Sequence, residues 1–159
     1  MISEHSLSTG WVWLAQCHNN LDRVSRLQIT FNKGRVRDLQ ITSSHHIAES
    51  WVEDNSVQLR NVRDKAVLCI TAWTKALIHN QDGSYSMRNG PFMRKFLDGY
   101  YPMRVSMEIN FSDTGLQLVS VAPRQQQGFV VIQESKRVSF DAWFEGRLKT
   151  EFRFEQARL

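Results

Sequence analysis

The sequence has little of the chemistry by which many proteins reveal their function. It contains two cysteines, three prolines and eight glycines in 159 residues. It holds no glycine-rich phosphate loop, HExxH zinc helix, CxxC pair or GxSxG elbow. This counts against the large nucleotide-binding and hydrolase classes, although an enzyme whose residues meet only in space stays open. We expect a non-catalytic protein with no metal and no cofactor.

Two cysteines are too few for a disulfide framework. Cys69 lies in an apolar run, where a free thiol behaves as a small hydrophobe. Cys17 and Cys69 could form one bridge, but nothing in the sequence brings their sulfur atoms together, so we expect buried free thiols in a reducing compartment. The first residues lack the basic and apolar regions of a signal peptide, and no window approaches the roughly 18 apolar residues of a membrane span. These features predict a cytoplasmic protein without a membrane span.

Length and composition predict a single domain over residues 1–159. Apolar residues make up 42% and charged residues 23% of the chain, which is close to the globular average. A chain of this size buries enough surface to fold without a metal or disulfide. The net charge of +4 is modest and mainly favours solubility.

The C-terminal half is dominated by strand patterns. In residues 103–111 apolar and polar residues alternate, which places Val105, Met107 and Ile109 on one face. Turn residues 112–115 and a returning strand over 116–121 predict a hairpin, with a bulge where Val119 and Val121 fall out of phase. Residues 129–133 predict a strand buried on both faces. Residues 137–144 and 148–154 alternate again, so the pattern predicts a five-strand meander.

The N-terminal part predicts another hairpin. Residues 27–31 alternate, Asn32-Lys33-Gly34 forms a turn, and residues 36–41 return with one phase slip near Asp38. Residues 11–15 before it are suited to a further strand.

The middle of the chain allows two interpretations. Val62, Ala66, Trp73 and Leu77 match a helical stripe, which favours a helix over residues 57–78, whereas its β-branched residues favour a strand. Residues 89–91 (Asn-Gly-Pro) predict the start of a short helix that ends at Gly99. The predicted fold is therefore α+β: an antiparallel meander, barrel-like or strongly curved, with one or two helices packed on it. The alternative is a nearly all-β chain.

The leading functional hypothesis is a binding domain that holds a small apolar ligand or a protein partner on a curved sheet. Most of the five tryptophans and nine phenylalanines are expected in the core, and the hypothesis is that several of them line a ligand pocket or a contact surface, where tryptophan and tyrosine are enriched. We expect Trp51, Trp73 and Tyr101 to line the ligand site. An apolar sheet face left uncovered by helices also predicts a possible homo-oligomer.

Two alternatives come from other classes of protein. The first is a basic nucleic-acid-binding module, since bases interleaved with aromatics suit single strands; its candidate residues are Arg26, Lys33, Arg35, Arg37, Arg94 and Lys95. The second is an enzyme with a dispersed site that uses His45 or His46. Because adjacent side chains diverge, these two histidines do not predict a metal site.

Overall fold

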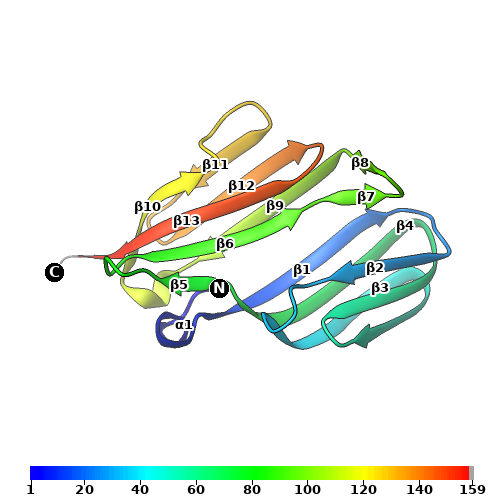
Figure 1. Ribbon diagram of the computed structural model, residues 1–159, viewed down its shortest axis with the longest axis horizontal. Coiled ribbons are helices and arrows are strands. Elements are labelled where there is room, and N and C mark those ends of the chain that lie inside the picture. Colours follow the sequence, from blue (N-terminus) through cyan, green and yellow to red (C-terminus); the bar gives the residue numbers. More distant parts are fainter. Residues whose placement is uncertain (158–159) are drawn as a thin grey trace. The chain divides into compact units, whose positions relative to one another are not determined.

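The computed structural model describes residues 1–157, and these are built almost entirely from antiparallel strands (Figure 1). The chain divides into two compact units: unit 1 comprises Met1–Gly10 and Ala76–Leu159, and unit 2 comprises Trp11–Lys75. The nearly all-β alternative is therefore the better description, because α1 (Glu4–Thr9) is the only α-helix of the described residues. Within residues 1–157, no helix is both long and apolar enough to cross a membrane. The single domain over residues 1–159 stays a prediction.

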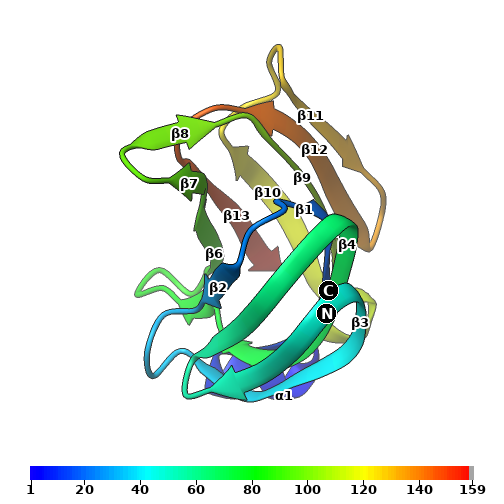
Figure 2. The ribbon, with the colours of Figure 1, turned by 90° about the vertical axis from the view of Figure 1, so that its right-hand side faces the viewer.

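Unit 2 is one antiparallel sheet folded back on itself. It contains β1 (Trp11–Leu21), β2 (Arg26–Thr30), β3 (Val36–Glu53) and β4 (Ser56–Lys75), with β4 paired to the other three. Thr30 pairs with Ser56, whereas Val36 pairs with Thr74. The five residues between Thr30 and Val36 reach about 20 Å, but a straight β4 would separate the two partners by about 60 Å. Strand β4 must therefore bend, and Figure 2 shows β3 and β4 curving together.

The bend is made by residues in the left-handed region. Asn61 and Lys65 in β4 have φ of 52° and 60°, and His46 in β3 has φ of 59° beside a register shift. Each position breaks the alternation of a regular strand. The inward side chains consequently change parity across the bend, and the core of unit 2 contains Val57, Leu59, Val62, Ala66, Leu68 and Ile70.

The helix predicted over residues 57–78 is therefore wrong: the segment forms β4 and β5 (Leu77–His79). A strand whose inward face switches from odd to even positions no longer has a period of two. Its buried residues at 62, 66 and 70 have the spacing of a helical stripe instead.

The predicted N-terminal hairpin is correct in its strands and wrong in its pairing. A turn does join β2 to β3, since the Arg35 N–H donates to the Asn32 carbonyl at 3.0 Å. Both strands, however, pair with β4 rather than with each other. The phase slip near Asp38 is confirmed, because Asp38 has φ of 53° and the register shifts between Arg37 and Gln40.

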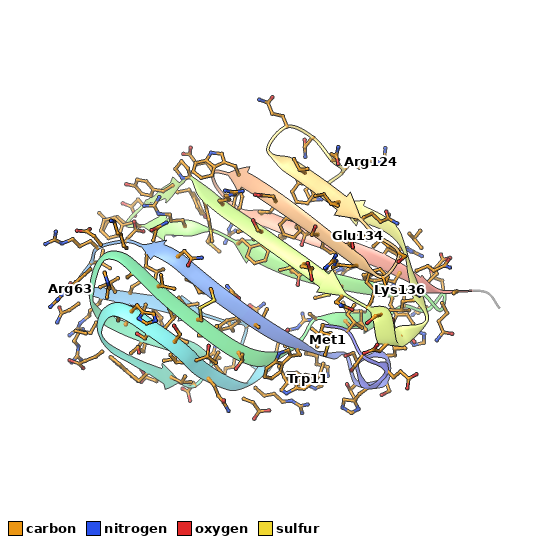
Figure 3. All side chains as sticks on the ribbon, turned by 180° about the vertical axis from the view of Figure 1, so that it is seen from behind. Met1, Trp11, Arg63, Arg124, Glu134 and Lys136 are labelled. Carbon is orange, nitrogen blue, oxygen red and sulfur yellow. A yellow bond between two sulfur atoms is a disulfide. The ribbon has the colours of Figure 1, made fainter. Side chains whose placement is uncertain are left out.

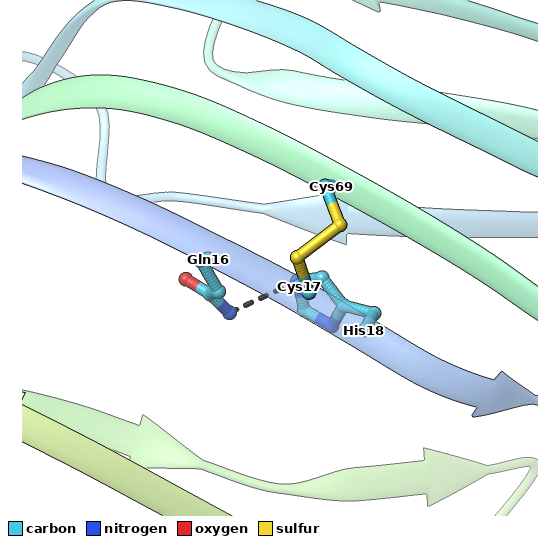
Figure 4. Close-up of a disulfide and its surroundings, with 4 residues drawn as sticks. All are labelled: Gln16, Cys17, His18 and Cys69. Carbon is cyan, nitrogen blue, oxygen red and sulfur yellow. Dashed lines mark hydrogen bonds between the residues drawn. A yellow bond between two sulfur atoms is a disulfide. The ribbon is translucent and has the colours of Figure 1, made fainter.

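The two cysteines form a disulfide, so the prediction of free thiols is wrong. Cys17 in β1 lies directly opposite Cys69 in β4, and Figure 4 shows the bridge between the strands. Cys17 is exposed rather than buried. The sequence showed no sign of the bridge, because the apolar run around Cys69 suggested burial, whereas alternate residues of that run face outward.

Unit 1 is a sandwich of two sheets. One sheet has the order β10-β13-β6-β5, the other has the order β11-β12-β9, and β7 and β8 form a separate hairpin. The two sheets appear as a front and a rear layer in Figure 1. The strands not yet given are β6 (Tyr85–Phe92), β7 (Arg94–Phe96), β8 (Gly99–Tyr101), β9 (Met103–Asn110), β10 (Leu116–Ala122), β11 (Phe129–Gln133), β12 (Arg137–Phe144) and β13 (Leu148–Gln156).

Phenylalanine side chains join the two sheets of unit 1. Phe140 from β12 stacks on Phe152 from β13 with ring centroids 6.0 Å apart, and Phe129 stacks on Phe140 at 5.1 Å. Phe111 meets Phe154 edge to face at 5.1 Å. The inward faces predicted for 103–111, 137–144 and 148–154 are confirmed, because alternate residues of β9, β12 and β13 are buried or half-buried.

The predicted meander is wrong, because among strands β9 to β13 only β11 and β12 pair as sequence neighbours, and the other consecutive strands belong to different sheets. Strand β9 pairs with β12, and β10 pairs with β13. The 3-10 turn η1 (Ser112–Thr114) thus carries the chain from one sheet to the other instead of closing a hairpin. The predicted bulge in β10 is confirmed by a register shift between Leu118 and Ser120. Strand β11 is an edge strand with one exposed face, not a strand buried on both faces.

The short helix predicted from residue 91 to Gly99 is also wrong. Strand β6 continues through Gly90, which has φ of 90° and lies at a register shift against β13. A Cβ atom at Gly90 would lie 2.5 Å from the Leu148 carbonyl oxygen. This close approach requires glycine, and Pro91 follows it within the strand. The chain then forms the β7-β8 hairpin, whose tip exposes Phe96 and Leu97.

Candidate functional site

Three large apolar side chains are exposed together on the outer face of the β11-β12-β9 sheet of unit 1. Trp143 is 63% exposed, Ile132 is 60% exposed and Val130 is 51% exposed. Val130 pairs with Asp141 and Ile132 pairs with Ser139, so all of these side chains share one face. We call this surface the Trp143 face; it comprises Arg104, Ser106, Glu108, Val130, Ile132, Ser139, Asp141 and Trp143.

The position of Trp143 is at odds with the pattern of its own strand. Val138, Phe140 and Ala142 point into the sandwich, so odd-numbered residues of β12 point to solvent. A tryptophan among them leaves a large ring in water. Single exposed apolar residues are ordinary, whereas a group of three on one face makes this surface a candidate contact site.

A shallow groove crosses the three strands at this face. It is lined by Ser106, Met107, Glu108, Val130, Ile132, Ser139, Phe140 and Asp141. The groove is open to solvent and mixes apolar with polar side chains. Small apolar ligands favour enclosed sites, so this geometry suits side chains from a protein surface.

Two ion pairs lie on the same face as the apolar residues. Arg104 Nε donates to Asp141 Oδ1 at 2.9 Å, and this hydrogen bonding with Arg104 lowers the pKa of Asp141 below its ordinary 3.8. Arg137 Nη2 lies 2.6 Å from Glu134 Oε2, and hydrogen bonding to Glu134 raises the pKa of Arg137. Asp141 and Arg137 therefore stay charged at neutral pH. The two pairs place charges of both signs beside the apolar side chains.

The free edge of β11 is covered by the loop that precedes it. The Val131 N–H donates to Gln125 Oε1 at 3.3 Å, and Gln126 and Phe129 exchange two backbone hydrogen bonds of 3.0 Å. Figure 3 shows this loop with Arg124 and the β11-β12 turn with Glu134 at the other end. Because exposed edges promote strand-to-strand aggregation, this loop protects part of the β11 edge from such pairing.

Gly128 fixes the start of β11 against β12. It has φ of 79°, and a Cβ atom there would lie 2.9 Å from the Trp143 carbonyl oxygen. The Trp143 N–H donates to the Gly128 carbonyl at 2.9 Å. Gly128 therefore positions the backbone that carries the Trp143 ring.

The predicted ligand-site residues do not form one wall. Trp51 and Trp73 belong to unit 2, where Trp51 pairs with Gln58 near one end of β4 and Trp73 lies near the other end. Trp73 is half-buried and packs edge to face on Trp13 at 5.3 Å. Tyr101 belongs to β8 of unit 1, where the Arg94 guanidinium lies 5.5 Å from its ring.

Several of the basic residues predicted to contact nucleic acid already have internal roles. Arg35 donates two hydrogen bonds, of 2.7 and 3.0 Å, to the Lys75 carbonyl. Arg37 lies 4.4 Å over the Trp11 ring. In unit 1, Arg94 donates to the Pro102 carbonyl at 3.2 Å, and Lys95 is exposed beside it in β7. Lys33 is exposed in the turn before β3, and Arg26 lies opposite Arg60.

The two adjacent histidines lie at the bend of β3. His46 has a positive φ, and its Nδ1 is 2.9 Å from the Asp64 carbonyl oxygen, while His45 is exposed. Across residues 1–157, no group of three or more His, Cys, Asp and Glu side chains is arranged to hold a metal.

The comparisons with known proteins add no assignment. No protein-family model, curated protein or solved structure matches the chain. The candidate site is therefore argued from the geometry of this structure alone. Sequence reasoning missed Trp143 as a site residue, although the signal was present: it is the one aromatic ring on the polar side of a clearly alternating strand.

Proposed function

We propose that this chain is a non-catalytic protein-binding domain that uses the Trp143 face of unit 1. The observation that supports it is the grouping of Trp143, Ile132 and Val130, each more than half exposed, on one sheet face. Tryptophan is among the residues most enriched at energetic hot spots of protein interfaces. The Arg104–Asp141 and Arg137–Glu134 ion pairs lie on the same face as these apolar side chains, and protein interfaces combine apolar contacts with charged groups of this kind.

A protein partner is favoured over the small apolar ligand that the sequence also predicted. The two best-formed concavities of the described residues are both shallow, and both are lined by charged side chains. Neither has the enclosed apolar walls that bury most of a small ligand. A flat mixed surface of this kind is instead complementary to another protein.

Nucleic-acid binding remains the alternative function. The contacts of Arg35 and Arg37 within unit 2 count against it, because a guanidinium that is already bonded gains less from a phosphate. An enzyme that uses His45 or His46 stays the weakest candidate.

The cytoplasmic location stays a prediction, and the disulfide makes it directly testable. Disulfides persist mainly in oxidising compartments. A count of free thiols in protein isolated from its own cells under alkylating conditions distinguishes the two cases. Two free thiols support the cytoplasm, and none supports an oxidising compartment.

Site-specific photo-crosslinking tests the proposed function. A photoreactive phenylalanine analogue replaces Ser139 on the Trp143 face, and in a second variant it replaces Lys149, which is exposed on β13 of the opposite sheet. We expect irradiation of living cells to yield one discrete adduct from position 139 and none from position 149.

Repeating the crosslinking from position 139 with one further substitution in the chain tests whether the adduct depends on Trp143. Trp143→Ser should abolish the adduct. Val119→Ser should leave it unchanged, because Val119 is 51% exposed like Val130 but lies on β10 of the other sheet. An adduct that survives Trp143→Ser, or equal adducts from positions 139 and 149, would contradict the proposal.

A further inference from the structure

Unit 2 carries a second, separate surface with ordered charges. The surface lies where β2 and the end of β3 pair with the start of β4, on the side that faces away from the core. There, Arg26 of β2 lies directly opposite Arg60 of β4. One row along the strands lie Trp51 and Gln58, and the next row holds Glu53 and Ser56. A concavity covers these rows and is lined by Arg26, Trp51, Glu53, Gln58, Leu59 and Arg60. We call it the Trp51 groove.

The arginine pair in this groove is only half satisfied. Arg60 Nη1 lies 3.0 Å from Glu49 Oε2, and its guanidinium lies 5.4 Å from the Trp51 ring centroid. Among the described residues, Arg26 has no ion-pair partner. Like charges directly opposite each other destabilise a strand pair. A bound anion beside Arg26 would offset this repulsion.

The other end of the groove has the opposite charge. The Glu53 carboxylate likewise has no ion-pair partner among residues 1–157. Between the two ends, Gln58 Nε2 donates to Ser56 Oγ at 2.9 Å, which leaves Gln58 Oε1 free to accept a hydrogen bond. Trp51 is 38% exposed and supplies an apolar surface in the middle row.

We propose that the Trp51 groove binds an extended peptide segment with an acidic, an apolar and a basic side chain at alternate positions. Rows on a sheet face are two residues apart, which is about 7 Å. Side chains on one face of an extended peptide have the same spacing, so three alternate residues match the three rows. The acidic group pairs with the Arg26 fork, the apolar group packs on Trp51, and the basic group pairs with Glu53.

The acidic residues of the groove favour a peptide over a nucleic acid. A nucleic-acid strand presents only negative charge along its backbone and needs a continuous basic track. Glu53 lines the groove itself, and Glu49 already occupies Arg60. A strand of phosphates would therefore meet repulsion at one end, whereas a peptide with both charges meets a partner at each end.

Titration by NMR tests the proposal with the full chain. The probe is the capped peptide SESFSKS, with SQSFSKS and SESFSQS as ligands that each lack one charge. The reporter is the Trp51 indole N–H signal, assigned from a Trp51→Phe variant. We expect saturable shifts, with SESFSKS binding about fivefold more tightly than either peptide that lacks one charge, as for exposed ion pairs of about 1 kcal/mol.

A double-mutant cycle assigns each charge to its partner. Arg26→Gln should remove the preference for SESFSKS over SQSFSKS, and Glu53→Gln should remove the preference over SESFSQS. Arg63→Gln is the matched control, because Arg63 is exposed at the bend of β4 (Figure 3) and carries the same charge. It should leave both preferences intact, and thermal unfolding confirms that each variant is folded.

The outcomes that would overturn the proposal are equally clear. Equal affinities for the three peptides, or no shift at millimolar peptide, would exclude an ordered charge site. Tighter binding of a single-stranded deoxythymidine decamer, weakening steeply with salt, would assign the groove to nucleic acid instead. The groove lies in unit 2, so none of these results bears on the Trp143 face.

Discussion

The two units of this chain achieve a buried core in different ways. Unit 1 packs two sheets around phenylalanine rings, with Phe111, Phe152 and Phe154 fully buried. Unit 2 has one sheet that folds over an aliphatic core, and residues with positive φ make the fold. A sandwich of separate sheets needs only regular alternation in each strand. A single sheet that covers itself needs backbone irregularities, and here it also has a disulfide across β1 and β4.

Because of this difference, we expect the stability of the two units to depend on different features. Aromatic packing stabilises unit 1, its strands β9, β11 and β12 pair without a register shift, and its outer face presents Trp143. Unit 2 buries smaller side chains, and we therefore expect its stability to depend on the bridge and the bend. Three changes confined to unit 2 test this contrast, each with a reference in unit 1 or elsewhere on the sheet.

Loss of the disulfide should have the largest effect. The bridge joins residues 52 positions apart, and the loss of such a constraint on the unfolded chain costs roughly 2–4 kcal/mol. Hydrogen exchange of the Cys17→Ser/Cys69→Ser variant should show this loss of protection in β1 and β4. Amides of β12 and β13 in unit 1 serve as the internal reference. Loss of protection confined to unit 1, or none in β4, would show that the bridge does not stabilise unit 2.

A β-branched residue at the bend should have an intermediate effect. Lys65 has φ of 60°, a conformation that costs about 1–2 kcal/mol for a β-branched residue. Lys65→Val should lower the denaturant midpoint by a corresponding amount. Glu155→Val is the control, because Glu155 is also exposed but pairs in continuous register with Gln117 of β10. Equal destabilisation by the two substitutions would show that the bend does not require the left-handed conformation.

The pH dependence of unit 2 should give the smallest effect. Burial lowers the pKa of His18 below its ordinary 6.5, so the unfolded chain binds the proton more readily. Stability from this group is present above pH 6.5 and decreases as the pH falls towards the lowered value. His18→Gln should flatten the stability of β1 between pH 7 and pH 5, whereas His5→Gln in α1 should not. If the free energy of unfolding of the His18→Gln variant depended more steeply on pH than that of the wild type, the prediction would be contradicted.

The strands of unit 1 could be predicted from the sequence because their alternation is unbroken. In 137–144 and 148–154 every second residue is apolar, and these faces are the buried ones. Their partners could not be predicted. Strands such as β9 and β10 are close in sequence but lie in different sheets, and pairing across a long separation leaves no local pattern.

Unit 2 resisted prediction for the opposite reason. The irregular positions at its bend are Asn61, Lys65 and His46, which are not glycines and gave no turn signal. Asn61 and Lys65 shift the buried face of β4 from odd to even residues, and the resulting spacing resembles a helical stripe. The disulfide was hidden as well, because Cys17 and Cys69 become neighbours only once β1 has paired with β4.

The candidate site was half visible in the sequence. The aromatic count indicated a binding surface, but Trp51, Trp73 and Tyr101 were chosen for their place in the chain. Trp143 could have been found from β12 alone, because it breaks the polar side of a regular strand. The exposure of Val130 and Ile132 could not have been predicted. The five-residue segment that contains them does not show that its strand lies at the edge of a sheet.

The central claim is that Trp143 anchors a protein partner, and a binding titration tests it most directly. The partner identified by crosslinking at position 139 is purified and titrated calorimetrically with the wild-type chain, Trp143→Ala and Val119→Ala. We predict that Trp143→Ala raises Kd by about 30-fold or more, the loss of a hot-spot residue of about 2 kcal/mol, while Val119→Ala changes Kd by less than about twofold. Equal Kd values for the wild type and Trp143→Ala would contradict the account.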